Sequence, residues 1–75
     1  MRTEYHAALE NAKRDVIRLG ALADDAIRWS IHALKRRDAP LAERVVAGAQ
    51  DIEALRRKLE AACMELIWRQ QPGRR

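Results

Sequence analysis

The sequence predicts an all-α fold, a helical hairpin of two long antiparallel helices, from its composition, its apolar spacing and its turn residues. Charged residues make up 35% and aromatic residues 4% of the chain, so the apolar share rests mainly on Ala, Leu, Ile and Val. Three Gly and two Pro leave little material for the many turns of a β-sandwich or barrel. A chain of 75 residues allows one small domain, which buries about 60% of the surface that it exposes when unfolded.

A first amphipathic helix is predicted over residues 3–36, where apolar side chains recur every three or four positions. Gly20 falls inside this segment and costs about 1 kcal/mol relative to Ala in a helix interior. We expect a close helix crossing at this glycine as the compensation.

The break between the helices is predicted from three neighbouring signals. Lys35-Arg36-Arg37 places cations at a helix C-terminus, Asp38 is a good N-cap, and Pro40 is tolerated only in a first turn. The predicted organisation is therefore one domain, 1–75, with helices at 3–36 and 40–70, a turn at 37–39 and a tail at 71–75.

Two helices pack along a single seam, so a wide apolar stripe on each stays largely uncovered in one hairpin. We therefore predict that two copies associate as an antiparallel four-helix bundle. Trp29 and Trp68 flank the main stripes and are expected to cover the seam between the copies, or to fill the place of a further helix. The expected interface residues are Tyr5, Leu9, Val16, Leu19, Ile27, Leu34, Val45, Ile52, Leu55, Leu59, Leu66, Trp29 and Trp68.

Few residues suggest catalysis, secretion or membrane insertion. A single cysteine, Cys63, cannot form an intrachain disulfide or a cysteine-based zinc site, and it sits on the apolar face as a small hydrophobe. His6 and His32 lie too far apart on one helix to share a metal. No membrane span or signal-peptide core is found, so we expect a cytoplasmic, non-enzymatic protein with no cofactor.

A nucleic-acid-binding hairpin is the alternative, because the net charge is +4 and basic residues cluster at 35–37 and 56–58. Successive helical residues point about 100° apart, however, so such a cluster fans around its helix. We also expect Arg57 to pair with Glu53, and Arg56 with Glu60. A solvated face laced with ion pairs is therefore favoured over a nucleic-acid site.

The order of several short segments resembles the N-terminal portion of PhoU proteins, the phosphate-uptake regulators of bacteria and archaea. The resemblance covers about residues 4 to 72, and its most specific part is the tail that ends in Gln-Gln-Pro. The segments are Tyr5 and Leu9, Leu19-Gly20-Ala21-Leu22, Ala26-Ile27-Arg28, Ala33-Leu34, Asp38, Leu41-Ala42, Val45-Val46, Ile52-Glu53-Ala54-Leu55, Cys63-Met64-Glu65-Leu66-Ile67 and Gln70-Gln71-Pro72.

The resemblance implies the first two helices of a PhoU-type three-helix bundle, with dimerisation as the simplest replacement for the third. It also implies a regulatory, protein-binding role in phosphate uptake or its signalling. The partners implied by intact relatives are the ATPase of the phosphate ABC transporter and a sensor histidine kinase.

Family members can bind a divalent or iron metal through an acid-x-x-x-Asp motif, and here the resemblance places Ala49 to Glu53 at that motif. Its first acid is thus missing, and a further family acid falls at Arg56. If the hairpin turns near Asp38, four acids lie at similar heights and form a weak candidate site for a hard cation. These four are Asp24, Asp25, Asp51 and Glu53, for which surface pairing with Arg is favoured over metal binding.

Overall fold

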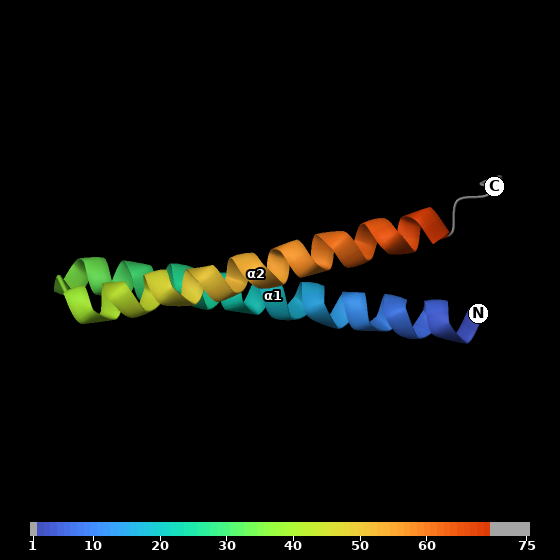
Figure 1. Cartoon of the computed structure of the whole chain (residues 1–75). Helices are drawn as coiled ribbons and strands as arrows, with labels where there is room; N and C mark the ends of the chain where they lie inside the picture. The colour runs from blue at the N-terminus through green and yellow to red at the C-terminus, as the bar shows by residue number, and fades with distance from the viewer. Residues whose placement is uncertain (1, 70–75) are drawn as a thin grey trace.

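The computed structural model describes residues 2–69, with side chains from residue 3 onward. It contains α1 (Arg2–Arg36) and α2 (Ala39–Arg69), joined by a short turn. The two helices run antiparallel and form a rod of 56 × 19 × 13 Å (Figure 1). This arrangement confirms the predicted all-α hairpin. The expected tail, and the last residue expected in the second helix, lie outside the described residues.

The turn ends one helix and begins the next within two residues. Arg37 adopts a positive φ of 54°. Its N–H donates to the carbonyl of Leu34 at 3.3 Å, and the N–H of Asp38 donates to the carbonyl of Ala33 at 3.0 Å. These two bonds form a Schellman motif, which satisfies the last carbonyls of α1. Asp38 then caps α2, as expected, since its Oδ1 accepts a hydrogen bond from the N–H of Leu41 at 3.0 Å.

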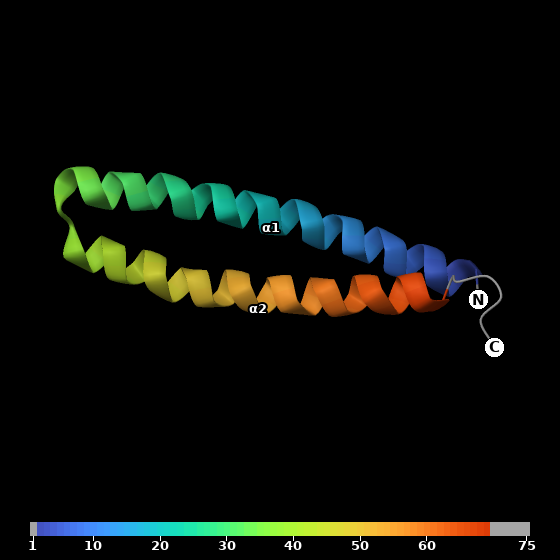
Figure 2. The ribbon, with the colours of Figure 1, turned by 90° about the horizontal axis from the view of Figure 1, so that it is seen from above.

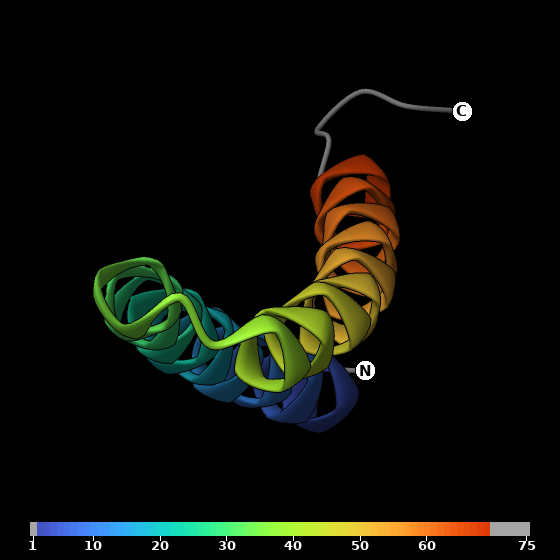
Figure 3. The ribbon, with the colours of Figure 1, turned by 90° about the vertical axis from the view of Figure 1, so that its left-hand side faces the viewer.

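The helices wind past each other along the rod. They overlap near the turn and diverge toward the opposite end in Figure 1, whereas in Figure 2 they diverge near the turn. The view along the rod in Figure 3 shows the crossing directly. We call the end opposite the turn, where α1 begins and α2 finishes, the open end. Within residues 2–69, neither helix has the apolar length that a membrane crossing requires.

The buried core is small and lies toward the open end. Ala12, Leu59 and Leu66 are 8–9% exposed and form one cluster. Near the turn, Ala33 is 4% exposed. No side chain among those described is less than 2% exposed, so the seam between two helices hides little apolar surface completely. The partly buried residues that pack against the core are Tyr5, Ala8, Leu19 and Cys63.

Among the described residues, the structure shows no close helix crossing at Gly20 within the hairpin, and the crossing expected at this glycine stays a prediction. A Cβ placed on Gly20 would meet no atom within 4 Å among the described residues. The reason is the direction of the helix seam, because Leu19 packs against the core and Gly20 lies about 100° farther around α1.

Candidate functional site

The most prominent surface feature is a row of large apolar side chains that the hairpin leaves in water. We call this surface the apolar face. Its members on each helix recur at intervals that bring them to one side, and each is 47–78% exposed. They are Val16, Ile27, Ile31 and Leu34 on α1, and Val46, Met64 and Ile67 on α2.

The two halves of the apolar face lie on the same side of the hairpin. Leu34 and Val46 line one shared hollow of about 470 Å³ beside the turn. From Leu34, the positions of Ile31 and Ile27 follow at three and seven residues, which keeps them on one side of α1. Met64 is eighteen residues from Val46, or five full turns of α2.

The expected interface residues divide into two groups in the structure. One group faces the other helix: Leu59 and Leu66 are buried, and Tyr5, Leu9, Leu19, Val45, Ile52 and Leu55 are half-buried. The other group is exposed and comprises Val16, Ile27, Leu34, Trp29 and Trp68. A contact between two copies stays a prediction for both groups.

Sequence reasoning missed four members of the apolar face as interface residues, namely Ile31, Val46, Met64 and Ile67. Ile31 and Ile67 were visible as the edges of wide stripes. Val46 and Met64 gave a weaker signal, because they lie to one side of the row that packs on α1.

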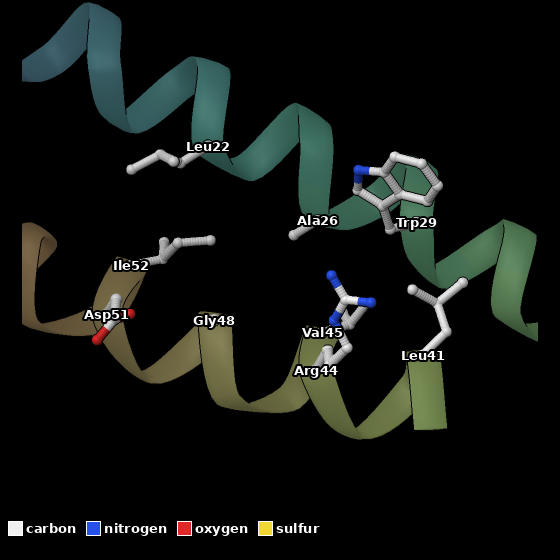
Figure 4. A pocket seen from close by; sticks show the side chains of 9 residues that line it. All are labelled: Leu22, Ala26, Trp29, Leu41, Arg44, Val45, Gly48, Asp51 and Ile52. Atoms are coloured by element: carbon white, nitrogen blue, oxygen red, sulfur yellow. The ribbon is translucent and has the colours of Figure 1, made fainter. Parts of the chain in front are cut away.

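A second apolar hollow, the Trp29 groove, opens between the helices in the half of the rod near the turn. Its volume is about 390 Å³. In Figure 4, Leu22 and Ala26 project from α1 toward α2, and Arg44 extends from α2 toward α1. Asp51 lies at the other end of the groove (Figure 4). The lining residues are Leu22, Ala26, Trp29, Leu41, Arg44, Val45, Gly48, Asp51 and Ile52.

Trp29 is held on one side by an aromatic contact within α1. Its ring and that of His32 meet edge to face, with centroids 5.7 Å apart and an interplanar angle of 89°. Trp29 nevertheless remains 52% exposed. The indole therefore offers a large, partly fixed apolar surface at the groove.

An ion-pair network occupies the middle of α2 and confirms the pairings expected for its acids and arginines. Arg56 bonds both Glu53 and Glu60, with 2.9 Å between its Nε and Glu53 Oε1. Arg57 Nε lies 3.4 Å from Glu53 Oε2. The hydrogen bond from Arg56, aided by its charge and that of Arg57, lowers the pKa of Glu53 to about 2. Two cations of the 56–58 cluster are thus partly neutralised, which weakens the nucleic-acid alternative.

The weak metal candidates are not brought together as a site. Asp24, Asp25 and Asp51 are exposed, and Glu53 is engaged by arginines. Within the part of the chain that the structure describes, no group of three or more His, Cys, Asp or Glu side chains could hold a metal ion. The donor set at the motif position therefore fits a surface ion pair better than a bound cation.

Comparison with known proteins assigns the chain to a family. Residues 16–75 match the PhoU domain. The chain belongs to the PhoU family. No solved structure gives a significant match.

Several PhoU relatives align with nearly the whole chain. A protein of Caulobacter vibrioides (strain NA1000 / CB15N), named phosphate-specific transport system accessory protein PhoU homolog, is 35% identical over 68 residues, which cover 91% of this chain and 30% of the relative. The homolog of Aquifex aeolicus (strain VF5) is 34% identical over 64 residues, or 85% of this chain and 29% of the relative. The PhoU protein of Escherichia coli (strain K12) is 26% identical over 69 residues, or 92% and 29%. The chain thus spans about 30% of the length of these relatives.

Proposed function

We propose that this chain is a non-enzymatic regulatory protein that acts in phosphate uptake or its signalling through contacts with other proteins. The observation that carries the proposal is the PhoU-domain match over residues 16–75. The aligned relatives are named as accessory proteins of a phosphate-specific transport system. We propose that this chain acts by binding components of such a transport system, in the cytoplasm.

The exposed surfaces of the hairpin support a binding role. Large apolar side chains in contiguous surface patches mark protein contacts, because leaving them in water is unfavourable. The Trp29 groove is a second such surface, because Trp29 and Arg44 both line this hollow between the helices. Trp and Arg in partly desolvated hollows contribute a large share of the binding energy in protein interfaces.

We propose the ATPase of the phosphate transporter as the occupant of the Trp29 groove. The names of the relatives point to the transport system itself, which favours this partner over a sensor histidine kinase. An apolar side chain from the ATPase would fill the hollow between Leu22 and Ile52, with Arg44 and Asp51 available for polar contacts at its edges.

Affinity of the purified chain for the ATPase tests the proposal. Trp29→Ala is expected to weaken binding by about 10-fold or more, since truncated tryptophan hot spots cost at least 2 kcal/mol. Trp68→Ala is the matched control, because Trp68 is similarly exposed and does not line the groove. Equal effects of the two substitutions would contradict the groove assignment.

Two further ligands complete the measurement. If the chain bound a sensor kinase and not the ATPase, the proposed partner would be wrong but the proposed regulatory role would stand. Tight binding to duplex DNA at about 150 mM salt, falling steeply as salt is added, would instead support the nucleic-acid alternative.

A further inference from the structure

The apolar face presents seven large side chains to water, each 47–78% exposed. Exposed apolar surface of this kind marks sites of protein contact. We propose that this face binds the same face of a second copy in an antiparallel four-helix bundle, with α1 crossing its counterpart at Gly20. The inference concerns self-association alone and does not depend on the proposed role in phosphate transport.

The apolar face is divided along the rod into two clusters. A turn cluster contains Ile27, Ile31, Leu34 and Val46, an open-end cluster contains Met64 and Ile67, and Val16 lies near the middle of α1. In an antiparallel pair with its two-fold axis near residue 55, Met64 of each copy lies opposite Val46 of the other, because both are nine residues from that axis. The turn-cluster residues of α1 lie over the N-terminal half of α1 in the other copy. Both clusters are then removed from water by a single closed, two-fold symmetric contact.

The charges at the turn favour the antiparallel arrangement. Lys35, Arg36 and Arg37 are all exposed at one end of the rod. In a dimer whose two turns lie at the same end, the three cations of each copy would bring six positive charges together. The antiparallel pair separates the two groups by about 50 Å, far beyond the roughly 10 Å over which exposed charges interact in moderate salt.

Gly20 lies where the two copies of α1 would cross. It is near the midpoint of α1 and follows Val16 by four residues and precedes Ile27 by seven, which places it on the apolar face. A Cβ on Gly20 would meet no atom within 4 Å in residues 2–69. A two-fold axis through this midpoint, perpendicular to the helices, brings Gly20 opposite its own copy, and the missing side chain allows the backbones to approach closely. With the turns together, α1 would instead lie over α2 of the partner copy.

The middle of α2 also suits an antiparallel pair. Glu53 and Glu60 continue the row of Val46 and Ile67 at intervals of seven residues, so the charged part of this row is central and its ends are apolar. The same two-fold axis passes close to residue 55, which brings Glu53 of each copy toward Arg56 and Arg57 of the other. Opposite charges at the centre of the contact fix its register.

Sedimentation equilibrium of the full chain at micromolar concentration tests the dimer. We expect twice the mass of 8.6 kDa. Ile27→Glu is expected to raise the dimer dissociation constant by about 100-fold or more, because two carboxylates would be buried without partners. Ala7→Glu is the control: Ala7 is exposed and lies about 160° around α1 from Ile27, away from the apolar face. A monomeric parent chain, larger assemblies, or equal effects of both substitutions would overturn the proposal.

Disulfide cross-linking tests the crossing point, even if Ile27→Glu does not fold. In a Cys63→Ser background, Gly20→Cys is expected to form a covalent dimer on mild oxidation. Ile31→Cys in the same background is the control, because the antiparallel arrangement separates its two copies by about 33 Å, whereas a disulfide needs Cα atoms within about 7 Å. Failure of Gly20→Cys to cross-link, or faster cross-linking of Ile31→Cys, would overturn the antiparallel geometry.

Discussion

The carboxylate of Asp38 accepts a hydrogen bond from the backbone N–H of Leu41, with 3.0 Å between Oδ1 and N. This N–H is one of the first donors of α2, which have no partner within the helix. The carbonyl of Asp38 also accepts the first helical bond, from the N–H of Ala42, at 3.0 Å. Asp38 therefore fixes the starting point of α2 with both its side chain and its backbone.

Replacing this cap should destabilise the hairpin. Asp38→Ala leaves the N–H of Leu41 without its acceptor, and we expect the free energy of unfolding to fall by about 1 kcal/mol. Urea unfolding followed by circular dichroism measures the change. Asp38→Asn keeps an acceptor oxygen and should retain most of the stability. If both variants lost the same amount, the carboxylate's charge and not its capping bond would be responsible.

Arg37 carries the opposite expectation, because its positive φ of 54° suits glycine better than a residue with a Cβ. Arg37→Gly should raise the free energy of unfolding by up to about 1 kcal/mol, less a small loss from removing a cation near the end of α1. Lys35→Gly is the control, since it removes a similar cation from a position with helical geometry and should destabilise. A loss of stability in Arg37→Gly would mean that the arginine side chain contributes more than the backbone strain costs.

The conformation of the turn could be predicted only in part from the residues around it. Asp38 and Pro40 predict where α2 begins because both residue types have a specific place in the first turn of a helix. The positive φ of Arg37 was not predictable, since the residue that ends a Schellman motif is usually Gly or Asn. Here the side-chain cap of Asp38 on α2 and the hydrogen bond from its N–H to the carbonyl of Ala33 impose the conformation on Arg37, the residue before it.

The exposed surfaces could not be predicted from the residue pattern of each helix alone. The spacing of apolar residues predicts a wide stripe on each helix, but it does not determine which edge of that stripe meets the other helix. A close crossing was expected at Gly20, but the pattern did not show which helix would cross there, and Gly20 lies on the apolar face rather than at the seam between α1 and α2. The Trp29 groove depends on how the helices cross, which no single-helix pattern contains. The four acids suggested for a metal share similar heights, but their directions around the helices keep them apart.

The ion-pair network of α2 predicts a dependence of stability on pH. The pKa of Glu53 is about 2 in the folded chain, against an ordinary value of 4.5. Between these values the unfolded chain binds more protons than the folded one, so the contribution of Glu53 is present above about pH 4.5 and is lost as the pH falls toward 2. Titration of the Glu53 carboxyl by NMR should show the lowered pKa directly.

A substitution and a series of salt concentrations distinguish the contribution of Glu53 to this pH dependence from that of other acidic residues. Glu53→Gln should make thermal unfolding less sensitive to acid between about pH 4.5 and 2. About 1 M salt should shrink the difference between the variant and the parent chain, because exposed ion pairs are screened. A carboxyl that titrates near its ordinary pKa would show that Arg56 and Glu53 are not persistently paired in solution.

The two internal glycines provide the last prediction, since they are equivalent within one chain and different in the proposed dimer. A Cβ on either Gly20 or Gly48 would meet no atom within 4 Å among the described residues. In a monomer, Gly20→Ala and Gly48→Ala should each raise the free energy of unfolding by about 0.5–1 kcal/mol through helix propensity. Gly48 lines the Trp29 groove, away from the apolar face, and should keep this gain at every protein concentration.

Gly20→Ala should behave differently once the chain associates. Its added methyl group would enter the crossing of the two α1 helices, so its gain in stability should shrink or reverse as concentration rises through the dimer dissociation constant. Thermal unfolding of both variants over a hundredfold range of concentration makes the comparison. If both alanine variants kept the same gain in stability over that range, Gly20 would face solvent in the dimer as well. The cost of this glycine to helix α1 would then not be compensated by a helix contact.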